Sequence, residues 1–123
     1  MKIYHSVLLV ASLIGSTPVW ATDTDWRSVT GKNLFKTFAE HELGDNVHFA
    51  YQFKSDGTFS GYEMTKNVRG KWRTTATQIC WAWIKPLAAE ECFEVLKWKN
   101  NVRLFKNRYE TEGGMLTPIK NAH

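Results

Sequence analysis

The chain has 123 residues, of which 43% are hydrophobic and 14% aromatic, and it carries a formal net charge of +4. This length leaves little room for a second folded domain. A net charge this small is ordinary for a soluble protein and favours an anionic partner only mildly.

The first 21 residues, MKIYHSVLLVASLIGSTPVWA, are typical of a secretory signal peptide, with a basic start at Lys2, an apolar run and a small-residue exit. The apolar run from Val7 to Ile14 is about half as long as the roughly 18 residues that a membrane span needs. We therefore expect cleavage after Ala21, a location in the periplasm or outside the cell, and no membrane span. Residues 22–123 form the predicted single domain, with 15 Lys and Arg against 12 Asp and Glu.

The mature chain is predicted to begin with a short helical turn through Trp26 to Val29, which Gly31 ends. A strand is expected over Lys32–Phe38. The clearest hairpin follows at residues 46–63, where aromatic and polar side chains alternate on both sides of a Ser-Asp-Gly turn. A three-residue loop with Gly57 in the left-handed position pairs Phe53 with Phe59 and Tyr51 with Gly61.

The next two strands are read from VRGKWRT and QICWAWI. In the first, alternation places Val68, Gly70 and Trp72 on one face and three cationic residues on the other. The second is almost continuously apolar, which predicts a strand covered on both sides and ended by Pro86.

Cys80 and Cys92 are the two cysteines of the chain. An exported chain meets oxidising conditions, so we expect a disulfide that joins two strands. Their C-x11-C spacing is neither the C-x-x-C of redox enzymes nor a paired zinc motif, so redox catalysis is not expected. Closing a loop of about 13 residues should stabilise the fold by roughly 3 kcal/mol.

The last hairpin is CFEVLKWKNNVRLFKNR. A three-residue loop over Lys99–Asn101 pairs Trp98 with Val102 and Leu96 with Leu104, whereas a two-residue Asn-Asn turn pairs Trp98 with Arg103. The first register gives cleaner faces and is preferred. A final strand is expected near Met115–Ile119.

Together these segments predict an all-β fold of seven or eight short antiparallel strands, a small up-and-down (lipocalin-like) barrel or a strongly curled sheet with one disulfide. The series TGKNL, YQFKSDGTFSG, RGKWR, ICWAW and ECFEV, from Gly31 to Phe105, resembles a class of small exported bacterial domains of unknown function. That class has a G-x-W-r, C-W-x-W, C-[FY]-x-V signature and a lipocalin-like barrel. The resemblance implies the fold and brings no catalytic residues.

Motifs for chemistry are weak in this sequence. The histidines after the signal lack H-E-x-x-H spacing, and Ser55 and Ser60 lack a G-x-S-x-G context. Glu90 and Glu91 are adjacent, so on a strand they face opposite ways and cannot share a substrate. Tyr62, Glu63 and Glu94 lie where they could line a barrel mouth, without an assigned role. We therefore expect no enzyme activity, no cofactor and no metal site.

The basic residues of the last hairpin are the first candidate site. They interleave with aromatic residues, as single-stranded nucleic acid requires, but export argues against nucleic acid and leaves anionic lipid headgroups or an acidic protein surface. The residues of this possible anionic-partner patch are Lys97, Lys99, Arg103, Lys106 and Arg108.

The aromatic residues that point into the barrel are the second candidate site. In a barrel of about eight strands they either fill the interior or leave room for one small ligand. The possible ligand-lining residues are Tyr51, Phe53, Phe59, Trp72, Trp81 and Trp83. The predicted function is non-enzymatic binding, of a small apolar ligand in the barrel mouth or of an envelope protein at its rim. The alternative is an accessory or inhibitor protein of a cell-envelope or secreted enzyme.

Overall fold

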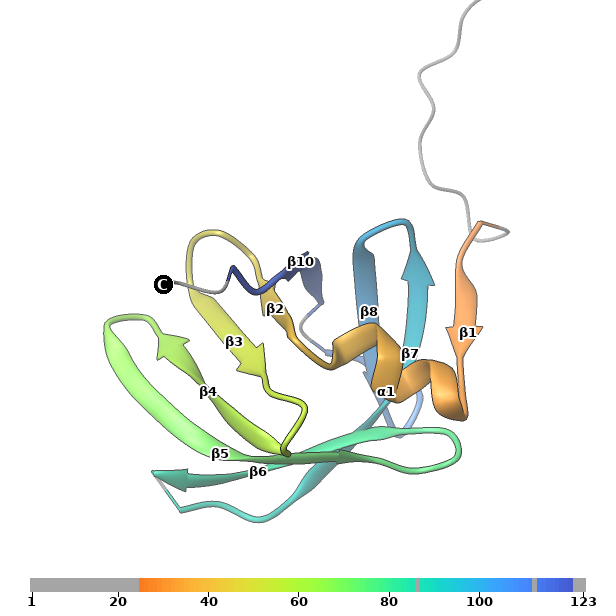
Figure 1. Ribbon diagram of the computed structural model, residues 1–123. Coiled ribbons are helices and arrows are strands. Elements are labelled where there is room, and N and C mark those ends of the chain that lie inside the picture. The colour runs from red at the N-terminus through yellow and green to blue at the C-terminus, as the bar shows by residue number, and fades with distance from the viewer. Residues whose placement is uncertain (1–24, 86, 112, 121–123) are drawn as a thin grey trace, which may run out of the picture.

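The structure is a computed structural model that describes residues 25–85, 87–111 and 113–120 (Figure 1). The predicted signal peptide, Pro86 and His123 lie outside the described residues. The elements in chain order are β1 (Arg27–Val29), α1 (Lys32–Phe38), β2 (His41–Gly44), β3 (Phe49–Phe53), β4 (Thr58–Glu63), β5 (Lys66–Thr74), β6 (Ile79–Lys85), β7 (Glu91–Trp98), β8 (Asn101–Lys106), β9 (Tyr109–Glu110) and β10 (Gly114–Pro118). Within these ranges, none of the helical structure has the length and apolar character of a membrane span.

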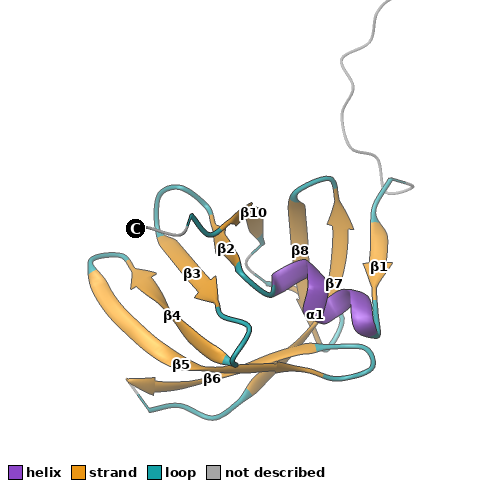
Figure 2. Ribbon diagram, viewed as in Figure 1, coloured by secondary structure: helices purple, strands orange, loops and turns teal. Residues whose placement is uncertain are grey.

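Eight of the strands close into an antiparallel barrel, which confirms the predicted fold class (Figure 2). The order around the barrel is β7, β6, β5, β4, β3, β2, β10 and β8, and β8 pairs back with β7. The chain departs from a simple meander because β10 lies between β2 and β8. Among the described residues, closure leaves no long open edge in the sheet, and the short strands β1 and β9 add to β7 and β8.

The core follows the predicted alternation along the central strands. β3 alternates buried and half-buried residues, and its register with β4 pairs Phe53 with Phe59 and Tyr51 with Gly61, as predicted. A Cβ atom at Gly61 would collide with the backbone carbonyl of Ala50, so the close approach of β3 and β4 requires glycine there. On β5, Val68, Gly70 and Trp72 are buried, while the three cationic residues between and after them are exposed.

The N-terminal predictions were wrong. Residues 27–29 form strand β1 rather than a helical turn, and Lys32–Phe38 is helix α1 rather than a strand. The helix follows Gly31, whose φ of 59° is in the left-handed region. Leu34 and Phe38 are four residues apart and both fully buried, so this short segment buries its apolar side chains with helical spacing.

The predicted register of the last hairpin was also wrong. Trp98 pairs with Asn101 across a two-residue turn, and Lys99 adopts a φ of 53° in that turn. Val95 therefore pairs with Leu104, and both side chains are 2% exposed. This register places Val95 inside the barrel and turns Leu96 and Arg103 outward, so burial of the aliphatic pair decides it.

The predicted disulfide is present. Cys80 on β6 and Cys92 on β7 are direct neighbours across the two strands, with their Cα atoms 4.0 Å apart. The prediction that β6 is covered on both sides is confirmed for Ile79, Cys80 and Trp81, which are at most 6% exposed, and wrong at the end of the strand, where Ile84 is 55% exposed. The sequence of β6 is apolar on both faces because Cys80, on the outer face, is buried in the disulfide, while Trp81 and Trp83 point inward.

Candidate functional site: the barrel mouth

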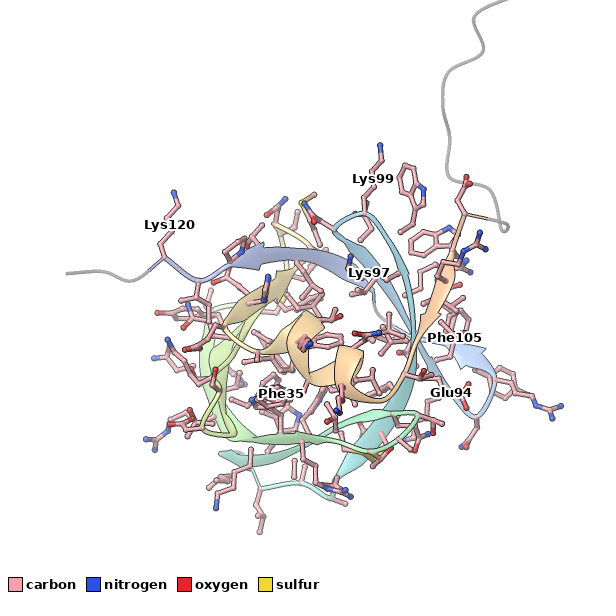
Figure 3. The ribbon with its side chains drawn as sticks, turned by 45° about the vertical axis from the view of Figure 1, so that its right-hand side comes forward. Phe35, Glu94, Lys97, Lys99, Phe105 and Lys120 are labelled. Carbon is pink, nitrogen blue, oxygen red and sulfur yellow. A yellow bond between two sulfur atoms is a disulfide. The ribbon has the colours of Figure 1, made fainter. Side chains whose placement is uncertain are left out.

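Helix α1 covers one end of the barrel. Figure 3 shows α1 inside the ring of strands, and Leu34 and Phe38 on this helix are 0% exposed. The Phe38 ring packs against Phe53 with centroids 5.1 Å apart, and Phe35 stacks on Trp72 at 5.2 Å. This end is therefore filled by side chains that come from outside the sheet.

The opposite end, which we call the mouth, is where the β2–β3, β4–β5 and β6–β7 connections lie. It contains a cavity of ≈ 190 Å³, which we call the mouth pocket. For scale, an engineered apolar cavity of about 150 Å³ holds benzene, whereas drug-sized ligands occupy roughly 300–1,000 Å³. The mouth pocket is lined by Leu43, Phe49, Tyr51, Glu63, Trp81, Trp83, Glu91, Phe93, Leu104 and Thr111.

Aromatic rings make the wall of the mouth pocket. Trp83 meets Tyr51 edge to face at 5.4 Å, and Trp81 packs against Phe93 at 4.6 Å. Below them, Phe59 stacks on Trp81 at 5.4 Å and belongs to the packed core. Behind this wall, Trp83 on β6 is paired with Gly70 on β5. A Cβ atom at Gly70 would collide with the Ala82 carbonyl, so the two strands approach closely there.

Two carboxylates complete the mouth pocket. Glu63 pairs with Phe49 and Glu91 pairs with Trp81, so both acids are on the inner face at the ends of their strands. The Tyr51 hydroxyl donates a hydrogen bond of 2.6 Å to Glu63 Oε1. Glu91 Oε1 accepts one of 3.1 Å from Lys106 Nζ, in an ion pair with side chains about half exposed.

The β2–β3 loop beside the mouth is held by Asp45. Desolvation raises the pKa of this carboxyl, but hydrogen bonds from the backbone N–H groups of Val47, His48 and Phe49 and from the His48 ring outweigh it. The pKa of Asp45 is therefore well below its usual range, and the ionised carboxylate fixes the loop.

The structure divides the predicted ligand-lining residues into two groups. Tyr51, Trp81 and Trp83 line the mouth pocket. Phe53, Phe59 and Trp72 are buried deeper and fill the barrel toward α1. Glu91 was not identified as a lining residue from the sequence. Its inward direction depends on the register between β6 and β7, and the irregular connection between these strands prevents that register from being predicted.

The predicted anionic-partner residues do not form one patch. Lys97 and Lys99 lie at the β7–β8 turn (Figure 3), with Lys99 Nζ 4.7 Å from the centre of the Trp98 ring. Lys106 and Arg108 lie at the other end of β8, a strand of 6 residues that spans about 20 Å. Arg103 is committed to a two-point ion pair with Glu110 and also lies over Trp26.

Metal ligands are not assembled in the described part of the chain. The single group of three potential ligands there is Cys80, Glu90 and Cys92, and its cysteines are joined in the disulfide. Bonded cysteines supply no thiolate, so this group is not a metal site.

Comparison with protein-family models, with curated proteins and with solved structures finds no match for this chain. The functional argument therefore depends on the residues of the barrel itself.

Proposed function

We propose that the chain is an exported, non-enzymatic binding protein that holds a small ligand in the mouth pocket. The observation that carries the proposal is a cavity of ≈ 190 Å³ left open at one end of an otherwise filled barrel. Its aromatic wall supplies apolar contact, and a few polar groups at its edge supply orientation, which is the usual composition of a ligand site.

The size of the mouth pocket limits the ligand. By the scale of the benzene-sized cavity, ≈ 190 Å³ accommodates roughly eight non-hydrogen atoms. The ligand is thus a small molecule or one group of a larger one that projects from the mouth. Cavities that carry long fatty chains are larger, so we do not propose a lipid carrier.

Native mass spectrometry of the protein exported by its own signal tests this proposal. We expect the mass of residues 22–123 with an oxidised cysteine pair, plus a discrete adduct that denaturation removes. Trp83→Ala should lose the adduct, because Trp83 lines the mouth pocket. The matched control is Trp98→Ala at the β7–β8 turn, which should keep it. An adduct retained by Trp83→Ala and lost by Trp98→Ala would contradict the proposed location.

A protein partner at the rim is the second candidate, which includes the role of an accessory or inhibitor protein. Three exposed apolar side chains favour it: Val47, Met64 and Leu87 are 77%, 70% and 87% exposed and lie in the three connections at the mouth. Apolar side chains gathered at one end are typical of contact surfaces.

The two candidates separate in a retention experiment with envelope extracts. A rim partner should be lost from immobilised protein when Met64 and Leu87 are both changed to Ser and kept in Trp83→Ala. The opposite pattern, loss only in Trp83→Ala, would favour a group inserted into the mouth pocket and argue against the rim.

A further inference from the structure

We propose that the mouth pocket selects a small organic cation, an alkylammonium group, rather than the neutral apolar molecule that the sequence predicts. This inference rests on the proposed function, because it names the chemistry of the ligand in the same pocket. Three features of the pocket support it: its charge, its rings and a built-in ammonium contact.

The local charge of the mouth pocket opposes that of the whole chain. The chain is basic, with a formal net charge of +4, yet the charged side chains among the described lining residues are Glu63 and Glu91. Lys106 pairs with Glu91 from the rim and is not among the lining residues. Lys66 is the partner of Glu63 across β4 and β5 and is likewise not among the lining residues. The charged groups that line the described part of the pocket are therefore two carboxylates with a lysine beside each of them, and an anionic ligand is disfavoured there.

Glu63 is the carboxylate that we assign to the cation. Its Oε1 atom accepts the Tyr51 hydroxyl at 2.6 Å, which orients the carboxylate without neutralising it. Tyr51 itself is only 5% exposed, so its hydroxyl has a fixed position in the wall. A carboxylate has about four acceptor positions, so the bond from Tyr51 leaves room for a ligand donor or for direct contact with a positive charge.

The rings of the wall suit a cation as well as an apolar group. Aromatic rings carry negative charge density on their faces, and tryptophan attracts cations best of the aromatic residues. Trp81 packs against Phe59 and Phe93 and is 6% exposed, so the half-buried Trp83 is the ring that we assign to the cation. Groups of such rings are used to recognise quaternary ammonium ions. The methyl groups of such an ion also bury apolar surface against the rings.

The ion pair between Lys106 and Glu91 is a model for the expected contact. The Lys106 ammonium lies 3.1 Å from Glu91 Oε1 at the edge of the mouth pocket. Both side chains are half exposed, so this pair is readily exchanged with water or with a competing ammonium group.

Calorimetric titration with choline and with 3,3-dimethyl-1-butanol tests the inference, because the two probes share one shape and differ in charge. Both fit within ≈ 190 Å³. We expect choline to bind at least about tenfold more tightly to the mature protein at low salt. Glu63→Gln keeps an oxygen for the Tyr51 hydroxyl but removes the charge, so it should weaken choline binding about tenfold and leave the alcohol unchanged.

The matched control is Glu94→Gln. Glu94 pairs with Phe105 and faces outward on β7, away from the mouth pocket (Figure 3). Glu94→Gln removes one negative charge from the chain, as Glu63→Gln does, so it should leave the affinity for choline within twofold of that of the parent protein. An equal loss in Glu63→Gln and Glu94→Gln would show a general charge effect and overturn the inference.

The remaining outcomes separate this inference from the proposed function. Equal affinity for choline and the alcohol, with loss of both in Trp83→Ala, overturns the cation and leaves the pocket as the binding site. No binding of choline, with a native adduct that Trp83→Ala loses, also overturns only the cation. No binding of either probe and no adduct overturns both.

Discussion

The two ends of the barrel have the same strands and differ in what fills them. At the α1 end, Leu34 and Phe38 are fully buried and Phe35 stacks on Trp72. At the mouth, the inner faces of β4 and β7 end in Glu63 and Glu91, and no helix of the described residues covers them. An eight-stranded barrel can either fill its interior with side chains or hold one small ligand, and here the filled end is the one that α1 covers.

We infer from this difference that side chains at the α1 end mainly stabilise the fold and that side chains at the mouth mainly form the binding site. Leu34 and Phe38 at the α1 end are fully buried, so truncating either of them leaves a cavity. Side chains at the mouth already border open space, so truncating them changes the pocket more than the fold. The following substitutions test that division, beginning with the largest effect.

The largest loss of stability is expected for a substitution in helix α1. Phe38→Ala should lower the free energy of unfolding by about 3–5 kcal/mol, because it leaves a cavity against Phe53. Urea unfolding of the purified variants measures the loss. Phe35→Ala is the control, since Phe35 is 41% exposed, and it should cost clearly less. Equal midpoints for the two variants would contradict the sealed α1 end.

The disulfide should have the next largest effect. Changing Cys80 and Cys92 together to Ala should cost about 3 kcal/mol, because the bond closes a loop of roughly 13 residues in the unfolded chain. The same unfolding experiment measures it. Protein that remains folded should keep its ligand, and loss of binding at unchanged stability would show that the disulfide acts on the mouth pocket.

At the mouth, the expected order of effects is reversed. Trp83→Ala should cost only about 1–2 kcal/mol, because its half-buried ring already borders the mouth pocket, yet it should remove most ligand binding. Paired unfolding and binding measurements test this. A loss of stability as large as that of Phe38→Ala, with binding kept, would place Trp83 in the structural core.

The smallest effect is a pH dependence at the β2–β3 loop. The folded pKa of Asp45 is lowered, so its contribution to stability is complete above its ordinary pKa of about 3.9 and is lost as the pH falls further. Asp45→Asn should therefore lose less stability than the parent protein between pH 5 and pH 2. Urea midpoints across this range provide the measurement, and parallel pH profiles would argue against the carboxylate as the loop's anchor.

The sequence predicted the parts of the fold that local patterns control. Alternation across the Ser-Asp-Gly turn gave the β3–β4 register, and two cysteines in an exported chain indicated the disulfide. It did not predict α1, because a seven-residue helix is too short for helical periodicity to show in the sequence. Its buried side chains, Leu34 and Phe38, form a single pair with a spacing of four residues. The last hairpin failed because the positive φ of Lys99 is unusual for that residue type.

The candidate site could be predicted only in part, for a related reason. Inward-facing aromatic residues follow from alternation, so Tyr51, Trp81 and Trp83 were identified. Which of them fill the barrel and which line a pocket depends on where α1 lies. Glu63 was also placed at a barrel mouth from the sequence, whereas the inward direction of Glu91 depends on its pairing with Trp81 across an irregular connection, and no local pattern encodes that pairing.

The most direct test of an open mouth opposite a sealed end is an NMR titration that follows the indole N–H signals of the mature protein. The probes are small neutral and ammonium compounds of up to roughly eight non-hydrogen atoms, which match the pocket volume. The account predicts that compounds that bind shift the Trp81 and Trp83 signals and leave Trp72, whose indole N–H donates to the Lys54 carbonyl at 2.8 Å, unchanged. Shifts confined to Trp72, or to Trp26 and Trp98 on the outer surface, would contradict it.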